Sequence, residues 1–328
     1  MKALRVHGFD GVGQWQIDEL VDPQLSPDDV LVQVEAASVS YVDLLLAQGR
    51  YQIRPDPPFV PGTEFCGVIT ACGSGAANML QPGQRVVGTV FGGAWAERVS
   101  AHWRDVTPVA CADDARAACT LPITYATARY ALKGRGDLQP GETVLVLGAT
   151  GGVGIAAVQV ARAMGARVVA AAQGSLKCSA AMRLGADFAV DTSRDSWRAD
   201  LKAVAEQGID LVVDPIGGPL TETAFRSLRW GGRHLVVGFA HGLIPALPAN
   251  LPLLKGAAFI GVDVRQFRER EPEAARDNLK AVVQWFSRRV VIPELAGVYP
   301  IGSWPAAMNA AARRETLGRV VLDWTSLK

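Results

Sequence analysis

The chain has 328 residues, of which 49% are hydrophobic and 20% charged, and its formal net charge is +1. That length is enough for two domains with buried cores, and the balanced charge gives no electrostatic reason to expect nucleic acid or an anionic membrane as a partner. The five cysteines are irregularly spaced, which fits reduced thiols better than a disulfide framework. Residues 1–6 lack a signal-peptide pattern and no apolar run is long enough to span a bilayer, so we expect a cytoplasmic protein.

Residues 1–121 favour β structure. Short, valine-rich alternating runs predict strands over 30–36 and 67–71. The Gln-Pro-Gly-Gln sequence at 81–84 predicts a turn, because proline fixes φ and glycine accepts the left-handed region. We therefore expect 1–121 to form a compact, mainly β domain.

From residue 122 the pattern changes to strands that alternate with helices. Helices are predicted over 154–164 and 177–184, and strands over 143–147, 167–172, 210–213, 234–237 and 258–262. This alternation is typical of right-handed βαβ units, so 122–263 is expected to form a doubly wound α/β domain with a parallel sheet. Residues 264–328 are predicted to contain a strand over 319–323 and a charged helix whose inner face carries Phe267, Leu279, Val283 and Phe286.

A glycine-rich segment follows the strand over 143–147 directly. A dinucleotide site needs a tight turn there and then close approach of backbone N–H groups to a pyrophosphate at a helix N-terminus. Gly151 can allow that approach and Gly154 close helix packing, although Ala149 replaces the first glycine of the usual pattern. Glycines alone also serve ordinary turns, but the strand before them and the helix after them favour a pyrophosphate site at Ala149, Thr150, Gly151, Gly152, Val153 and Gly154.

The strand over 167–172 bears on the choice of cofactor. Sites that prefer NAD place an acidic residue at its end, where the carboxylate binds the ribose 2′-hydroxyl. No acidic residue occurs between Gly154 and Asp187, whereas Ser175 and Lys177 can bind and neutralise a 2′-phosphate. The alternative is that Lys177 only begins a solvated helix. The missing acid favours NADPH.

Seven segments spread over nearly the whole chain carry the motifs of one family: 39–43, 49–51, 58–64, 92–97, 121–128, 148–154 and 314–322. With these motifs the chain resembles the zinc-independent quinone oxidoreductases of the medium-chain dehydrogenase/reductase superfamily. The resemblance implies a GroES-like β-rich domain formed by 1–121 together with 264–328, and a Rossmann domain over 122–263 that binds NADPH.

The resemblance also implies which positions would hold zinc. Zinc-dependent relatives bind their catalytic metal with Cys, His and Cys, and the matching positions here are Ser40, Thr63 and Ile123. Two hydroxyls and an aliphatic side chain do not make a zinc site, and no C-x-x-C occurs. We expect no metal, and we expect structural or surface roles for the four scattered histidines, which are His7, His102, His234 and His241.

Without zinc, a conjugated carbonyl is the more suitable acceptor, because conjugation spreads the charge that hydride addition creates and hydrogen bonds can stabilise it. The resemblance places Tyr41, Tyr51 and Ser40 near the reacting groups. Tyr51 matches a tyrosine regarded as the proton donor in related enoyl-thioester reductases, so it is the preferred general acid. The alternative is that the tyrosines only fill the core. Relatives often have Asn in place of Ser40, which leaves the pattern of oxygen binding open.

Further cofactor contacts follow from the resemblance. Thr124 and Thr127 begin the helix that leads into the Rossmann domain, and Thr192 stands where many relatives have a tyrosine near the adenine. Arg314 matches an arginine that approaches the adenosine phosphate, with a solvent-facing residue as the alternative. The carboxyl ends of the later strands add Pro215, Gly238, Phe239, Gly261 and Val262.

The sequence is compatible with three functions. The leading one is an NADPH-dependent quinone reductase, and its chemical rival is a reductase of enones, 2-alkenals or enoyl thioesters. From another class comes a non-catalytic NADPH-binding protein that acts as a sensor or as a crystallin-like structural protein. Relatives are usually dimers that extend the Rossmann sheet, so we expect a homodimer through the strand over 258–262 and a small-molecule quinone or enone as substrate.

Overall fold

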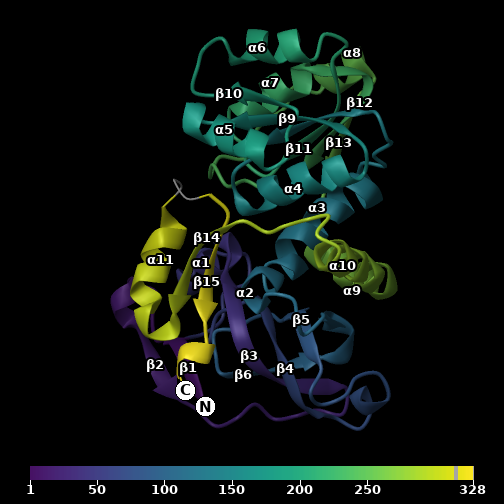
Figure 1. The fold of residues 1–328 in the computed structure, drawn as a ribbon. Helices are drawn as coiled ribbons and strands as arrows, with labels where there is room; N and C mark the ends of the chain where they lie inside the picture. The colour runs from purple at the N-terminus through teal and green to yellow at the C-terminus, as the bar shows by residue number, and fades with distance from the viewer. Residues whose placement is uncertain (314–316, 328) are drawn as a thin grey trace. The chain divides into compact units, whose positions relative to one another are not determined.

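The computed structural model describes residues 1–313 and 317–327, and the chain divides into two compact units (Figure 1). The β-rich unit comprises Met1–Ile123, Pro272–Ser287 and Pro293–Lys328. The α/β unit comprises Thr124–Glu271 and Arg288–Ile292.

A seven-stranded sheet forms the centre of the β-rich unit, with the order β14-β15-β3-β4-β5-β7 and with β6 also paired to β3. Residues along the first part of β3 are alternately buried, as expected for a strand with one face on a core. A separate antiparallel pair is formed by β1 (Lys2–Val6) and β2 (Trp15–Glu19). The strands of the large sheet are β3 (Asp29–Val39), β4 (Glu64–Cys72), β5 (Arg85–Thr89), β6 (Arg98–His102), β7 (Val106–Pro108), β14 (Leu295–Pro300) and β15 (Arg319–Asp323).

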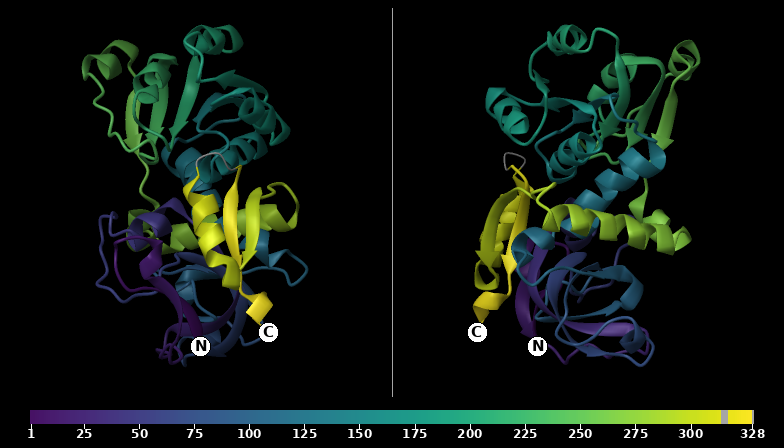
Figure 2. Two further views of the ribbon diagram at one scale, coloured as in Figure 1. Left: turned by 90° about the vertical axis from the view of Figure 1, so that its left-hand side faces the viewer. Right: turned by 45° about the vertical axis from the view of Figure 1, so that its right-hand side comes forward.

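Both ends of the chain build this sheet. The last strand, β15, pairs antiparallel with β3, and β14 lies parallel to β15. Figure 2 shows these yellow strands beside α11 (Trp304–Ala312). The core beneath them joins Leu4, Phe65 and Trp95 to Ile301 and Met308. The other helices of this unit are α1 (Tyr41–Ala47), α2 (Ala115–Ala118) and α10 (Pro272–Ser287).

The α/β unit contains a six-stranded sheet with the order β10-β9-β8-β11-β12-β13, in which all neighbours are parallel. Its strands are β8 (Thr143–Leu147), β9 (Arg167–Ala172), β10 (Phe188–Asp191), β11 (Ile209–Asp214), β12 (Leu228–Val236) and β13 (Ala258–Gly261). Its helices are α3 (Ala126–Arg129), α4 (Gly152–Ala163), α5 (Ser175–Arg183), α6 (Trp197–Val204), α7 (Leu220–Arg226), α8 (Asn250–Lys255) and α9 (Val264–Arg270).

Helices cover both faces of this parallel sheet, which leaves its central strands β8, β9 and β11 buried almost throughout. On one face, side chains of α6, α7 and α8 pack on β8; the members of this core include Trp197, Leu201, Phe225, Leu251, Leu145 and Leu147. Figure 1 shows α3 and α4 on the opposite side of the sheet. The predicted fold class, a GroES-like β-rich domain with a doubly wound Rossmann domain, is confirmed.

The charged helix expected after residue 263 is wrong as a single element. The chain forms two helices there, α9 and α10, and Pro272 begins the second, because proline lacks the N–H that a continuing helix would need. Phe267 of α9 stacks on Tyr130 within the α/β unit, with ring centroids 3.8 Å apart. The chain therefore leaves that unit after Glu271 and not after residue 263.

The segment Arg288–Ile292 returns briefly to the α/β unit, which the sequence did not indicate. Gln159 of α4 holds it in place: the side-chain amide donates to the Ile292 carbonyl at 2.8 Å and its oxygen accepts from the Ile292 N–H at 2.8 Å. The first crossing between the units lies at Ile123 and Thr124, whereas the sequence placed the change after residue 121.

Candidate functional site

The glycine-rich loop after β8 is tightly packed at one glycine, Gly154, and has an open corner at another, Gly151. A Cβ added to Gly154 would lie 2.0 Å from the Gly148 carbonyl oxygen, so α4 packs on the loop at a distance that only glycine allows. A Cβ added to Gly151 would meet only that same oxygen, at an ordinary 3.5 Å. Gly151 is also the N-cap of α4 and offers no side-chain cap, so the first N–H groups of the helix are left for an anion.

The loop after β9 contains the residues predicted to bind a 2′-phosphate. Gly174 takes φ +86° and α5 begins at Ser175, with Lys177 in its first turn. Thr192 stands where many relatives have a tyrosine near the adenine, and its backbone N–H and hydroxyl both donate to the Ala172 carbonyl, at 2.9 and 3.3 Å. Thr192 thus ties β10 to the end of β9.

One acidic residue at this corner was missed. Asp191 ends β10 in register with Ala172, and its Oδ1 accepts the Gly174 N–H at 2.8 Å. The same oxygen accepts the N–H and the hydroxyl of Ser193, and these hydrogen bonds lower the pKa of Asp191. Asp191 lies beyond the stretch from Gly154 to Asp187 that follows the glycine-rich loop, and only the parallel pairing of β9 with β10 brings it beside the end of β9.

The carboxyl ends of β11 and β12 carry three of the other predicted cofactor residues. The Gly238 N–H donates to the Asp214 carbonyl at 3.3 Å, and the Pro215 carbonyl accepts the Ala240 N–H at 3.1 Å. Phe239 lies between these contacts in sequence and is 37% exposed. The structure thus brings Pro215, Gly238 and Phe239 together in one pair of adjoining loops.

The remaining predicted cofactor residues of this unit lie at two places. Gly261 ends the edge strand β13, and Val262 is buried, with its N–H donating to the Val236 carbonyl at 2.9 Å. Thr124 and Thr127 are buried in the segment where α3 lies between two π-helical turns, a rare geometry that is frequent at functional sites. Arg314 lies outside the described residues.

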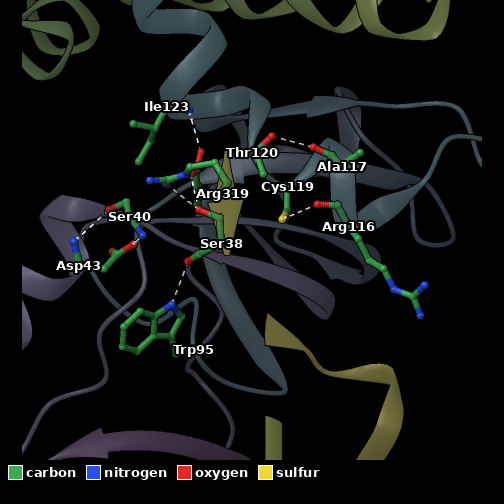
Figure 3. Close-up of polar contacts among 11 residues, drawn as sticks. Ser38, Ser40, Asp43, Trp95, Arg116, Ala117, Cys119, Thr120, Ile123 and Arg319 are labelled. Atoms are coloured by element: carbon green, nitrogen blue, oxygen red, sulfur yellow. Dashed lines mark hydrogen bonds and ion pairs between the residues drawn. The ribbon is translucent and has the colours of Figure 1, made fainter. Parts of the chain in front are cut away.

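Ser40 is the N-cap of α1 in the β-rich unit. Its hydroxyl accepts the Asp43 N–H at 2.9 Å and its own N–H donates to Asp43 Oδ2 at 2.7 Å, which completes a reciprocal capping box (Figure 3). Of the two tyrosines expected near the reacting groups, Tyr41 begins this helix and is 46% exposed, whereas Tyr51 lies half-buried in the loop that follows.

Asp43 is fully buried, and that burial dominates its ionisation. Loss of hydration disfavours the charged carboxylate and raises its pKa from 3.8 to about 6, although the hydrogen bonds with Ser40 and the charge of Arg319 act in the opposite direction. The carboxyl group therefore changes its charge near pH 6, well above the range of an exposed aspartate.

A second buried carboxylate lies beside the positions that match the zinc ligands. Glu64 accepts the Ile123 N–H at 2.9 Å and pairs with the Arg319 guanidinium at 2.6 Å. The Ser38 hydroxyl donates to Glu64 and accepts from Arg319, and the Ser38 carbonyl accepts the Trp95 indole N–H (Figure 3). This network joins β3, β4 and β15, so the C-terminal strand is fixed to the N-terminal half of its sheet.

The donor set at these positions does not fit zinc. Ser40 and Thr63 offer hydroxyls, and Ile123 offers an aliphatic side chain and a backbone N–H already donated to Glu64. Across residues 1–313 and 317–327, the structure contains no group of three His, Cys, Asp or Glu side chains that could hold a metal.

No helix in the described part of the chain is long and apolar enough to cross a membrane. Residues 26–111 match the alcohol dehydrogenase GroES-like domain family, and residues 152–281 match the zinc-binding dehydrogenase family. Quinone oxidoreductase-like protein 2 of Bos taurus is 34% identical over 309 residues, which covers 94% of this chain and 88% of the relative.

Two solved structures extend the likeness. The quinone oxidoreductase of Thermus thermophilus, described alone and in complex with NADPH, has a TM-score of 0.86 and 30% identity over 98% of this chain and 100% of its own. Mycobacterial Rv1454c complexed with NADPH has a TM-score of 0.89 and 26% identity over 98% and 100% of the two chains. The chain is an oxidoreductase that belongs to the quinone oxidoreductase family of the medium-chain dehydrogenase/reductase superfamily.

Proposed function

We propose that this protein is an NADPH-dependent reductase that transfers hydride, without zinc, to a quinone or a similar conjugated carbonyl compound. The observation that carries the proposal is the open corner at Gly151 beside the uncapped N-terminus of α4, in a chain whose T. thermophilus relative forms a complex with NADPH. The free N–H groups at a helix N-terminus are a general binding site for a phosphate anion.

Different groups of residues in the α/β unit bind different parts of the cofactor. The loop of residues 149–154 holds the pyrophosphate, and Ser175 and Lys177 hold the 2′-phosphate. In a doubly wound sheet each half binds one nucleotide, so β8 to β10 serve the adenosine half and β11 to β13 the nicotinamide half. Thr124, Thr127, Pro215, Gly238, Phe239, Gly261 and Val262 then serve the nicotinamide half. NADPH, when bound, supplies the hydride.

Zinc independence is part of the proposal because the residues at the ligand positions have the wrong chemistry. An alcohol–ketone interconversion needs a strong Lewis acid at the oxygen, whereas a conjugated acceptor spreads the new charge over several atoms. Hydrogen-bond donors then suffice, and the chain provides hydroxyls at Tyr41, Tyr51 and Ser40.

Tyr51 is the proposed proton donor. Addition of one hydride to a quinone gives a hydroquinone monoanion. A side chain that donates a proton to its oxygen completes the two-electron reduction to the hydroquinone. The half-buried Tyr51 hydroxyl gives its proton to that oxygen and regains one from solvent, while Tyr41 and Ser40 orient the acceptor. All three residues belong to the β-rich unit.

We also propose a homodimer in which the Rossmann sheet continues across β13. This strand is the last in the order of its sheet, and it pairs only with β12 among the described strands. Its neighbourhood exposes large apolar side chains at Phe259 and at Trp230 of β12, which are 41% and 74% exposed. An unpaired edge with exposed apolar residues is the kind of surface that pairs with a second strand.

An acceptor screen tests the function. The purified protein, with its metal content measured, is assayed for NADPH oxidation with quinones, with enones and 2-alkenals, and with enoyl thioesters. Fastest turnover with quinones, and loss of most of that rate in Tyr51→Phe, is the expected result. Faster turnover with enones or thioesters would mean that one of these, and not a quinone, is the acceptor. NADPH binding without turnover on any class of acceptor would show a non-catalytic sensor or crystallin-like protein. Stoichiometric zinc in the active protein would overturn the metal-free mechanism.

A further inference from the structure

Two loops at the carboxyl end of the Rossmann sheet are joined through one residue, Asp214. It ends β11, and its backbone carbonyl accepts the N–H groups of Val237 and Gly238, which follow β12. Beyond it, the Pro215 and Ile216 carbonyls accept the N–H groups of Ala240 and His241 at 3.1 and 2.9 Å. We call residues 215–219 and 237–243 the loop pair.

The carboxylate of Asp214 holds the first loop as well. Oδ1 accepts the N–H groups of Ile216 and Gly217 at 2.9 and 2.7 Å, and Oδ2 accepts the Thr221 hydroxyl at 2.6 Å and faces His234 Nε2 at 3.1 Å. Burial acts to raise the pKa of Asp214, but the hydrogen bonds from His234, Thr221 and Gly217 outweigh it and leave the pKa below its ordinary value. The group is therefore a fixed anion with donors on both oxygens.

The two loops touch along their glycines. Gly217 and Gly218 have φ of +68° and +65°, and added Cβ atoms would lie 2.9 Å from the Phe239 ring and 2.8 Å from the His241 ring. Only glycine allows both the backbone angles and the contact. The position of Phe239 thus depends on the path of the first loop, and Asp214 sets that path.

His234 is an unusual residue for the core that surrounds it. It is completely buried on β12, between the rings of Phe225 at 6.0 Å and Phe259 at 5.0 Å. Because Asp214 accepts from Nε2, the proton is on that nitrogen, and Nδ1 has no hydrogen-bond partner within the described residues. An aliphatic side chain would fill such a site without an unpaired nitrogen, so what histidine adds here is its N–H toward Asp214.

We propose that Asp214 is the positioning residue for the nicotinamide half of the cofactor, with His234 and Thr221 fixing its carboxylate. Asp214 touches no ligand in this arrangement; it acts through Pro215, Gly238 and Phe239 on the loop pair. The inference rests on the proposed function, because those three residues are assigned there to NADPH.

A comparison of two ligands tests this role. NADPH reaches both halves of the site, whereas adenosine 2′,5′-bisphosphate occupies only the adenosine half. In full-length Asp214→Asn, NADPH binding is expected to weaken about tenfold, the order of change caused by one misplaced hydrogen-bonding group, while the affinity for the bisphosphate stays unchanged. A purely structural role would change both affinities together or neither.

Conservative variants and a matched control complete the design. His234→Gln keeps an N–H for Asp214 and is expected to bind NADPH nearly as the wild type does, whereas His234→Phe loses the donor and weakens NADPH alone. If Asp214→Asn does not fold, His234→Gln and His234→Phe test the role by the ratio of NADPH affinity to adenosine 2′,5′-bisphosphate affinity. Asp323→Asn is the control and should leave both ligands unaffected. Asp323 also ends a strand, β15, and it accepts a backbone N–H and a threonine hydroxyl, both from Thr325.

The outcomes separate the two claims. Wild-type protein that binds neither ligand would overturn the proposed function. Wild-type protein that binds NADPH, together with Asp214 and His234 variants that lose both ligands equally or neither, would overturn only the positioning role.

Discussion

Three aspartates fix local structure through hydrogen bonds, two of them buried (Asp43 and Asp214) and one partly exposed (Asp191). Asp43 completes the cap of α1, Asp191 holds Gly174, and Asp214 holds the loop pair. None of these three carboxylates was identified as a site residue from sequence. The capping box of Asp43 is local in sequence, but its burial is not readable from a linear pattern. Asp191 and Asp214 each also bond a residue that only strand pairing brings near, Gly174 and His234.

The raised pKa of Asp43 should make the free energy of unfolding depend on pH. The folded protein binds this proton more tightly than the unfolded chain, because the pKa rises from 3.8 to about 6 on folding. The associated stabilisation is complete below pH 3.8 and is lost as the pH rises through 6, an effect on the order of 3 kcal/mol. Asp43→Asn keeps an acceptor for the cap and removes the charge.

The measurement is urea denaturation of the wild type and of Asp43→Asn between pH 4 and pH 7. The wild type should lose stability relative to the variant as the pH rises. Asp114→Asn, at the exposed cap of α2, is the control and should follow the wild type. Parallel curves for the wild type and Asp43→Asn would show that Asp43 ionises normally.

Asp191 makes a prediction about cofactor preference. Its charge lies at Gly174, beside the residues proposed for the 2′-phosphate. Asp191→Asn keeps an oxygen for the Gly174 N–H and removes the repulsion, so the affinity for NADPH relative to NADH should rise by about threefold to tenfold. Asp187→Asn, which holds the Val168 N–H at the other end of the same strands, should leave the ratio unchanged. An unchanged ratio in Asp191→Asn would contradict a 2′-phosphate at Ser175 and Lys177.

At the scale of elements, two glycines of one loop have separate tasks. Gly151→Ala meets no steric obstacle in the free protein but occupies the space proposed for the pyrophosphate. Its folding stability should equal that of the wild type, and its NADPH binding should weaken at least tenfold. Gly154→Ala forces a Cβ against the Gly148 carbonyl and should cost about 1–3 kcal/mol of stability. Thermal unfolding and NADPH titration of both variants measure the two effects, and equal losses of stability would contradict the division.

Periodicity predicted the elements of the α/β unit better than it predicted their limits. Strands at 143–147 and 167–172 coincide with β8 and β9, because fully buried parallel strands are short, uniform apolar runs. The break between α9 and α10 lies at Pro272, within the charged run 268–273, and the expected single helix joined Phe267 to Leu279 across it. The two helices pack in different units. The turn at 92–97 and the loop with Tyr51 have no periodic signal, so only the family motif indicated them.

At the scale of the whole molecule, the edge strand β13 predicts the oligomeric state. Sedimentation of the wild type should give twice the chain mass of 34.8 kDa. Phe259→Asp places a charge on that edge and should give monomers, because a buried, unpaired charge would be costly in the paired strands. Val298→Asp is the control. Val298 lies on β14, the edge strand of the other sheet, and it is about as exposed as Phe259. A monomeric wild type would refute the dimer.

We propose above that this chain, free of metal, transfers a hydride from NADPH to a conjugated carbonyl compound. In a single-turnover experiment, EDTA-treated protein that carries one equivalent of NADPH is mixed with a quinone, and the redox state of the nucleotide is followed. We expect complete oxidation to NADP⁺, and slower oxidation in Tyr51→Phe. NADPH that stays reduced with quinone, enone and enoyl thioester alike, or that is oxidised only after zinc is added back, would contradict it.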